Sequence, residues 1–222
     1  MQFSSLARLL ATVIGVVEIT NVVIASVVFA SKCPDGIIIG SDGLIGTGIF
    51  VSSRSSKKIA RLNRNSVVAC AGGETDFFRL CEDLEGQCSA HALFSQCEMG
   101  TKSIARLARA LIYSKYHHAH IIIAGCEDFV SDDNMNDWSI HEILPGGSHL
   151  DVLDRTVAGS GSSLASSYLM DLASTAAISL EESIEIAKKV LNMVISFDHK
   201  SGGSVQLYRF TRVQGLARLS PA

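Results

Sequence analysis

Ser26, Asp42 and Lys58 carry side chains that could perform chemistry together. A serine hydroxyl is a poor nucleophile at neutral pH and needs a base. That base can be the chain's own α-amine, whose unperturbed pKa is near ~8, if the serine becomes the first residue of a processed chain. A nearby lysine lowers the pKa of the hydroxyl, and an aspartate keeps the lysine charged and oriented. Taken alone, an Asp and a Lys on neighbouring strands are more often a solvated surface pair.

The segment that contains these residues predicts short strands. Val27 to Ala30 and Ile37 to Ser41 are apolar runs, joined by a Cys33-Pro34-Asp35-Gly36 turn in which Pro and Gly suit the required backbone angles. The second run places Asp42 at its end. A glycine-rich turn and a third apolar stretch then lead to Lys58. We therefore expect the hydroxyl, the carboxylate and the ammonium on neighbouring strands.

Composition restricts the class of protein. With 222 residues the chain is long enough for one large domain. A net charge of -3, with only 18% charged residues, argues against strong nucleic-acid binding, whereas 47% hydrophobic residues favour apolar surface buried against other subunits. The six cysteines include no C-x-x-C pair and no zinc spacing, which predicts free, buried thiols in a reducing compartment.

The first 25 residues allow three interpretations. Val23-x-Ala25 before Ser26 resembles the cleavage site of a signal peptide. A membrane helix is a weaker candidate, because Glu18 and Asn21 interrupt the apolar run that would have to span the bilayer. The third interpretation is a cleaved propeptide.

Apolar periodicity predicts the remaining elements. Helices are expected from about Thr75, from an N-cap at Thr101 to Tyr116, and after a capping box at Ser179. The expected strands and hairpin are Ser66–Cys70, Ile121–Gly125, Ser139–Leu144, Asp151–Val157, and Ser204–Phe210 with Leu216–Leu219. Strands grouped in this way favour two antiparallel sheets face to face with helices outside, an α+β architecture.

Two further motifs offer weaker signals. His117, His118 and His120 could hold a metal, but polar residues at the end of a helix more often complement its C-terminus, so no metal site is predicted. The glycine-rich segment from Ala158 to Ser163 could cradle a phosphate. It lacks the third glycine of the dinucleotide fingerprint and the Walker lysine, so nucleotide binding is disfavoured.

Several motifs in this order resemble those of a 20S proteasome β-type subunit, an N-terminal-nucleophile (Ntn) hydrolase. The resemblance runs from about Ser26 to about Leu219, and its glycine-serine segments look most like the caspase-like β subunit type. The motifs that carry it are Gly36-Ile37-Ile38-Ile39-Gly40-Ser41-Asp42, Thr47-Gly48, Lys58, Ala71-Gly72-Gly73, Gly159-Ser160-Gly161-Ser162-Ser163 and Asp198-x-x-Ser201-Gly202-Gly203.

The resemblance implies a fold and a function. The fold would be a four-layer αββα sandwich over residues 26–222, with residues 1–25 a leader or propeptide. The function would be that of a threonine-type endopeptidase family member in stacked heptameric rings of α and β subunits, in the cytoplasm and nucleus. Unfolded polypeptides would be its substrates, with no metal, organic cofactor, nucleic acid or membrane involved.

The resemblance also implies roles for individual residues. Ser26 would be the nucleophile, Asp42 and Lys58 the catalytic pair, and Gly72 the oxyanion-hole glycine. Ser160, Asp198 and Ser201 would surround the terminal amine and position a proton-relay water. Cys70 would line the substrate pocket.

The chain departs from the family pattern at several positions. Ser26 stands where the family has threonine, Ala25 where it has glycine, and Leu44 where active members usually carry an arginine. Cys70 replaces the basic residue of caspase-like subunits, so a preference for acidic substrates does not follow. Two readings stay open: an active serine variant, and a non-catalytic subunit that fills a ring position and keeps Asp42 and Lys58 as a structural pair.

Overall fold

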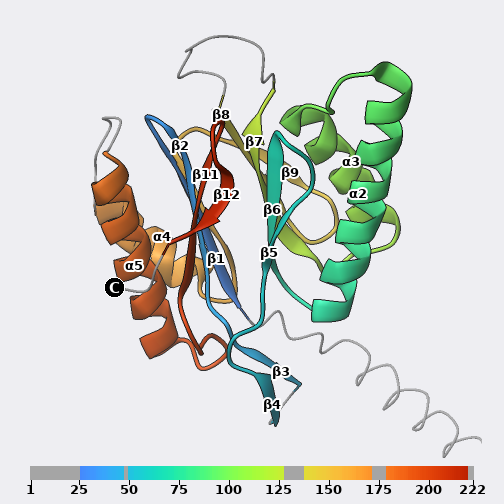
Figure 1. The fold of residues 1–222 in the computed structure, drawn as a ribbon. Helices are drawn as coiled ribbons and strands as arrows, with labels where there is room; N and C mark the ends of the chain where they lie inside the picture. Colours follow the sequence, from blue (N-terminus) through green and yellow to red (C-terminus); the bar gives the residue numbers. More distant parts are fainter. Residues whose placement is uncertain (1–25, 48–49, 128–137, 172–178, 220–222) are drawn as a thin grey trace, which may run out of the picture.

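Two five-stranded antiparallel sheets face each other between two pairs of helices. This computed structural model describes residues 26–47, 50–127, 138–171 and 179–219. Figure 1 shows four layers: α4 and α5, the first sheet, the second sheet, and α2 with α3. The α+β sandwich predicted from the sequence is confirmed. The leader assigned to residues 1–25 lies outside the described residues.

The first sheet has the strand order β10-β1-β2-β11-β12 and the second has β5-β6-β7-β8-β9. A separate hairpin is formed by β3 and β4 and projects below the sheets in Figure 1. The strands are β1 Val27–Cys33, β2 Gly36–Ser41, β3 Ile45–Thr47, β4 Phe50–Ser53, β5 Ile59–Arg61, β6 Ser66–Ala71, β7 His120–Cys126, β8 Trp138–Ile143, β9 His149–Val152, β10 Arg155–Gly159, β11 Gln206–Thr211 and β12 Gly215–Arg218. The helices are α2 Glu74–Ser95, α3 Thr101–Ser114, α4 Ser162–Asp171 and α5 Leu180–Phe197.

Strands that are apolar on both faces explain the layered packing. In β1, Val28 and Ala30 point into the core between the sheets, whereas Val27 and Phe29 pack with residues of α5 on the other side. An antiparallel strand with one solvated face would alternate apolar and polar residues. The unbroken run of apolar residues in β1 therefore requires a helix layer outside the sheet.

The turn and the helix ends follow local sequence rules. The predicted Cys33-to-Gly36 turn joins β1 to β2, and Gly36 has φ of 154°. A Cβ there would lie 2.1 Å from the carbonyl oxygen of Phe210, so only glycine lets the turn approach β11. The predicted capping box at Ser179 is present, because its hydroxyl accepts from the N–H of Glu182 and the Glu182 carboxylate accepts from the N–H of Ser179.

Some predicted boundaries were wrong. Gly100, not Thr101, caps α3; the Thr101 hydroxyl is buried and donates to the carbonyl oxygen of Cys126 at 2.9 Å. The predicted strand Asp151–Val157 is two strands in different sheets, separated near Leu153, which is 84% exposed.

The described cysteines are all free, as predicted, and all are buried except Cys97, which is exposed. Among the described residues, none of the helices combines the length and the apolar character needed to cross a bilayer.

Candidate functional site

The hydroxyl, ammonium and carboxylate meet at the first described residue. The Nζ atom of Lys58 donates to Ser26 Oγ at 2.5 Å and to Asp42 Oδ1 at 2.6 Å. Ser26 directly precedes β1, Asp42 follows β2, and Lys58 precedes β5, so the ammonium links one sheet to the other. The three residues are at most 5% exposed, so they are not the solvated pair that a lone Asp and Lys would suggest.

Asp42 is held by backbone N–H groups as well as by the lysine. Its Oδ1 accepts from the N–H of Val27 at 3.0 Å, and its Oδ2 accepts from those of Leu44 at 3.3 Å and Gly202 at 3.0 Å. Buried charges are stable only when they are paired and hydrogen-bonded, and this carboxylate meets both conditions. Its position is therefore fixed by the turn that follows it and by two segments elsewhere in the chain.

Lys58 sits between two opposing influences. Burial lowers the pKa of its ammonium from the ordinary value, and the charge and hydrogen bond of Asp42 act in the opposite direction without fully cancelling the effect. A protonated lysine here donates a hydrogen bond to Ser26 Oγ and would stabilise negative charge on that oxygen.

A second group surrounds the backbone nitrogen of Ser26. Ser160 Oγ lies 3.4 Å from that nitrogen and donates to Asp198 Oδ2 at 2.6 Å, and Ser201 Oγ donates to the same oxygen at 2.8 Å. Burial acts to raise the pKa of Asp198. Hydrogen bonds from Ser160, the N–H of Lys200 and Ser201 outweigh that effect and hold the pKa below its ordinary value.

Gly159 allows β10 to approach Ser26 closely. Its φ is 111°, and a Cβ at this position would lie 2.1 Å from the carbonyl oxygen of Ser26. The N–H of the next residue, Ser160, donates to that same oxygen at 3.0 Å. Glycine is therefore required on both steric and conformational grounds.

Gly72 and Cys70 lie beside this network. The N–H of Cys70 donates to the carbonyl oxygen of Lys58 at 3.0 Å, and Gly72 begins the turn from β6 into α2. Burial raises the pKa of the Cys70 thiol to about 12, although Lys58 partly opposes the shift. The thiol is thus neutral at physiological pH, and Cys70 is 3% exposed and belongs to the core cluster that includes residues of α2 and α3.

A chain of hydrogen bonds that the sequence did not predict lies behind the site, between the two sheets. Gly159 donates its N–H to His120 Nδ1 at 3.2 Å, so the proton of the imidazole resides on Nε2, which donates to Glu142 at 2.8 Å. Thr156 also hydrogen-bonds to Glu142. Histidine was expected to complement a helix end; instead His120 begins β7 and connects the two sheets. Only the register between strands reveals this contact.

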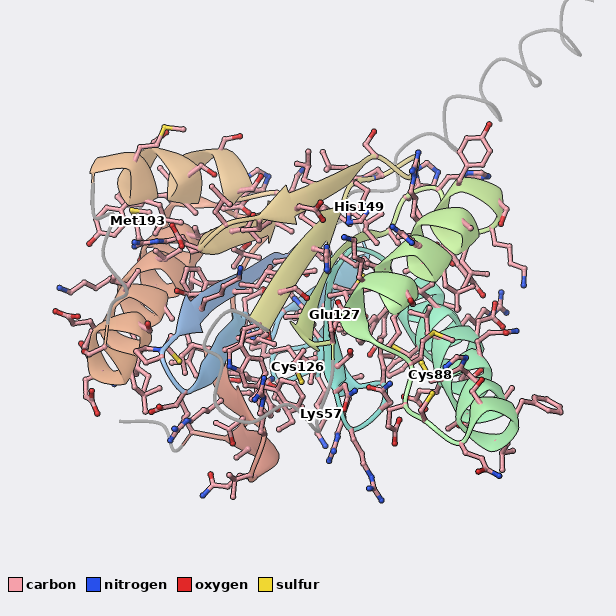
Figure 2. The ribbon with its side chains drawn as sticks, turned by 90° about the horizontal axis from the view of Figure 1, so that it is seen from above. Lys57, Cys88, Cys126, Glu127, His149 and Met193 are labelled. Carbon is pink, nitrogen blue, oxygen red and sulfur yellow. The ribbon has the colours of Figure 1, made fainter. Side chains whose placement is uncertain are left out.

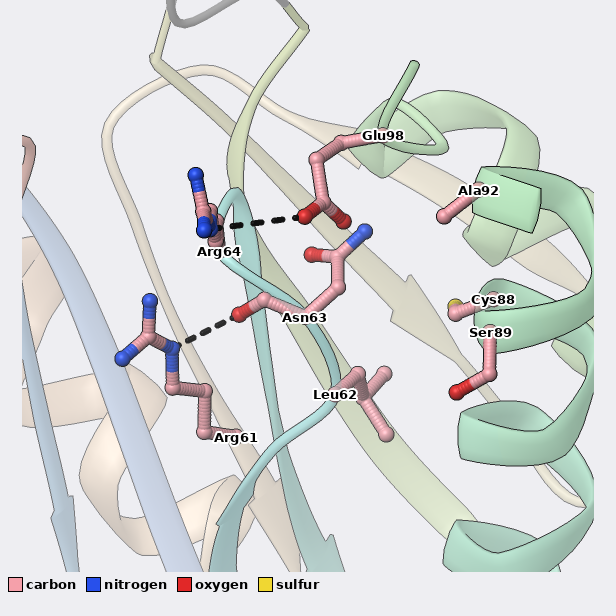
Figure 3. A pocket seen from close by; sticks show the side chains of 8 residues that line it. All are labelled: Arg61, Leu62, Asn63, Arg64, Cys88, Ser89, Ala92 and Glu98. Atoms are coloured by element: carbon pink, nitrogen blue, oxygen red, sulfur yellow. Dashed lines mark hydrogen bonds and ion pairs between the residues drawn. The ribbon is translucent and has the colours of Figure 1, made fainter. Parts of the chain in front are cut away.

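A cavity of about 410 Å³ lies between the connection from β5 to β6 and the C-terminal half of α2 (Figure 3). It is lined by Arg61, Leu62, Asn63, Arg64, Cys88, Ser89, Ala92 and Glu98. Arg61 donates to the carbonyl oxygen of Asn63 at 2.7 Å, and Arg64 pairs with Glu98 at 3.7 Å. None of the predicted site residues lines it.

Comparisons with known proteins agree with this geometry. A family model described as "Proteasome subunit" matches residues 22–209. The chain is 27% identical over 186 residues to "Probable proteasome subunit beta type-1" of Encephalitozoon cuniculi, covering 83% of this chain and 87% of that protein. It is also 27% identical over 197 residues to "Proteasome subunit beta type-1" of Saccharomyces cerevisiae, covering 86% of each.

An archaeal relative extends the comparison. The chain is 22% identical over 179 residues to "Proteasome subunit beta" of Ferroglobus placidus, covering 81% of this chain and 83% of that protein. The family model spans most of the chain, and these relatives carry the β designation. The chain therefore belongs to the proteasome subunit family, and to its β type.

Proposed function

We propose that this chain is a catalytic β subunit of a 20S proteasome core particle, in which Ser26, exposed by removal of residues 1–25, cleaves peptide bonds. The observation that carries the proposal is the pair of short contacts from Lys58 to Ser26 and Asp42, 2.5 and 2.6 Å long. A buried lysine that served structure alone would need only the carboxylate.

The proposed reaction uses the α-amine of Ser26 as the base. Cleavage after Ala25 converts the backbone nitrogen of Ser26 into an amine beside Ser160. Ser160, which is hydrogen-bonded to Asp198, would position the water that relays the proton. The amine takes the proton of the hydroxyl, and Oγ attacks the substrate carbonyl carbon while Lys58 stabilises the developing charge. The C–N bond then breaks, the leaving peptide amine takes the proton from the α-amine, and an acyl-enzyme ester remains. Water hydrolyses this ester, which releases the second product as a carboxylic acid and restores the hydroxyl of Ser26.

Two further residues are assigned to substrate. We assign Gly72 as an oxyanion donor because it lies at the N-terminal end of α2, where the helix dipole favours negative charge. Cys70 would line the pocket as a small neutral side chain. The glycine-serine segments resemble those of the caspase-like type, but a neutral thiol favours small or apolar substrate residues over acidic ones.

The proposed setting is a ring of α and β subunits that encloses unfolded polypeptides, in the cytoplasm and nucleus. Exposed apolar residues are consistent with surfaces that other subunits cover; they include Leu93, Phe94, Leu153, Met170 and Phe197, each more than 75% exposed.

A non-catalytic ring subunit is the second candidate, and one contact favours it. Leu44 stands where active members carry an arginine, and its side chain packs beside Gly202, next to Ser201 and Asp198. A leucine brings no charge to Asp198. In a non-catalytic subunit, Asp42 and Lys58 would serve only to hold the two sheets together.

Substitution of Ser26 in the assembled particle tests the proposal. Ser26→Ala should retain residues 1–25, seen as the larger mass of the intact chain, and should abolish labelling by a covalent inhibitor of N-terminal nucleophiles. Ser26→Thr is the matched control and should restore both cleavage and labelling, because threonine carries the same hydroxyl. If the wild-type chain keeps its leader in the particle and takes no label, the non-catalytic reading holds. Because a neighbouring subunit can cut the leader in trans, labelling of this chain is the deciding readout.

A further inference from the structure

Two histidines and an aspartate converge at the outer edge of the second sheet, away from the catalytic residues. His141 Nδ1 lies 2.8 Å from Asp151 Oδ1 and 3.2 Å from His149 Nε2, which is 3.4 Å from the same carboxylate oxygen. Strand register creates this cluster: His141 in β8 lies opposite Asp151 in β9, and His149 is two residues before Asp151 on the same face. Figure 2 labels His149.

These distances match the edges of a metal coordination sphere. Four ligands at roughly 2.0–2.1 Å from Zn²⁺ in a tetrahedron lie about 3.3–3.4 Å from each other, so an ion can contact all three atoms with little movement. The fourth position would be open to water or to an anion.

The surroundings of His141 add a second observation. The side chain is 4% exposed, and its Nε2 has no hydrogen-bond partner among the described residues. The polar contacts of this buried ring are therefore those within the cluster, an arrangement that is costly for a buried polar group. A cation bound at Nδ1 would take the place of the contacts that Nδ1 makes with Asp151 and His149, and the proton of the ring would then be carried by Nε2.

The ligand types select the kind of ion. Two imidazoles and a single carboxylate suit Zn²⁺ and similar transition metals, whereas Mg²⁺ and Ca²⁺ prefer oxygen ligands throughout. Arg106 and Arg109 line a cavity of about 470 Å³ together with Ser148, and both arginines act electrostatically on His149. Their positive charge disfavours a weakly bound cation and favours an anionic fourth ligand.

We propose that His141, His149 and Asp151 form a Zn²⁺ site that joins β8 to β9, with its fourth position open to water or an anion. The site is independent of the proposed proteolytic activity, because none of its residues touches Ser26, Asp42 or Lys58.

Zinc binding by the purified full-length chain tests the proposal. His149→Gln and Asp151→Asn alter the outer strand, where substitution leaves the core intact, and His118→Gln, at an exposed histidine outside the cluster, is the control. Mutating a residue that only hydrogen-bonds to a metal ligand typically costs about 10–100-fold in metal affinity. Loss of a ligand itself should therefore weaken Zn²⁺ binding by more than about 100-fold. The control variant His118→Gln should bind Zn²⁺ as tightly as the wild type does. Zn²⁺ should raise the melting temperature of the wild type and of the control only.

Co²⁺ substitution identifies the ligand atoms, because the chain also carries free thiols. Nitrogen and oxygen ligands should give a spectrum without thiolate charge-transfer bands. The proposal is overturned if the wild type binds no Zn²⁺, if the two cluster variants bind it as tightly as His118→Gln does, or if thiolate bands dominate the spectrum.

Discussion

Replacing Lys58 by methionine tests how strongly the buried ion pair holds the two sheets together. Methionine is unbranched and one atom shorter than lysine, and it leaves Asp42, which is fully buried, without its cation. Breaking a buried pair from one side typically costs about 3–5 kcal/mol. The carboxylate would keep its bonds to the N–H groups of Val27, Leu44 and Gly202, so we expect the lower end, a loss of about 3 kcal/mol in the free energy of unfolding.

This loss is measurable by urea and thermal unfolding of the full-length chain. At roughly 2–4 °C per kcal/mol for a chain of this size, Lys58→Met should lower the melting temperature by about 6–12 °C. Lys57→Met is the matched control, because Lys57 is the exposed neighbour labelled in Figure 2, and surface substitutions usually change stability by less than about 0.5 kcal/mol. Equal stabilities of the two variants, at equal slopes against urea, would refute the claim that the buried pair anchors the sheets.

Three further outcomes follow from the site. Gly159→Ala should lower the free energy of unfolding by at least about 2 kcal/mol, because its Cβ would clash with Ser26 and its φ is positive. Gly73→Ala is the control and should not destabilise the chain, because its Cβ would meet nothing within 4 Å. Equal unfolding curves for the two variants would contradict this prediction. The pKa of Asp198 is lower in the folded chain than its value of about 3.9 in the unfolded chain, so this carboxylate stabilises the fold at pH values above the unfolded pKa. That stability is lost as the pH falls through the folded pKa, so Asp198→Asn should flatten the acid side of a plot of stability against pH. An unchanged acid side would count against this prediction. Peptidase activity should fall at alkaline pH as the ammonium of Lys58 deprotonates, and the fall should come below pH 10.5, the ordinary pKa of a lysine. A rate that stays constant up to pH 10.5 would contradict a role for this charge.

Local patterns were sufficient for the strands around the site. Apolar runs bounded by Pro, Gly and Asp located β1 and β2, and so placed Asp42 at a strand end. They failed between Asp151 and Val157, because the mixture of apolar and polar residues there does not show that the chain bends and changes sheet. The exposed Leu153 marks that bend, and the two halves pair in different sheets.

Contacts between distant segments could not be read from local patterns. The bond from Gly202 to Asp42 spans 160 residues, and the contact from Ser160 to Ser26 spans 134. The resemblance to a known family linked Ser160 to Ser26 beforehand, but nothing linked Gly202 to Asp42. The pairing of His120 with Glu142 depends on the register of β7 and β8, which apolar periodicity does not specify. The same reason explains why the cluster at His141 had no signal in the sequence.

The bond between Gly202 and Asp42 also sets an order of events during synthesis. Ser26, Asp42 and Lys58 are synthesised early, but Gly202, whose N–H donates to the Asp42 carboxylate, is synthesised only after α5. A half-made chain therefore contains Ser26, Asp42 and Lys58 but lacks the N–H group of Gly202 that completes the hydrogen bonding of the Asp42 carboxylate. The fixed position of this carboxylate is thereby reached only when nearly the whole domain has been synthesised.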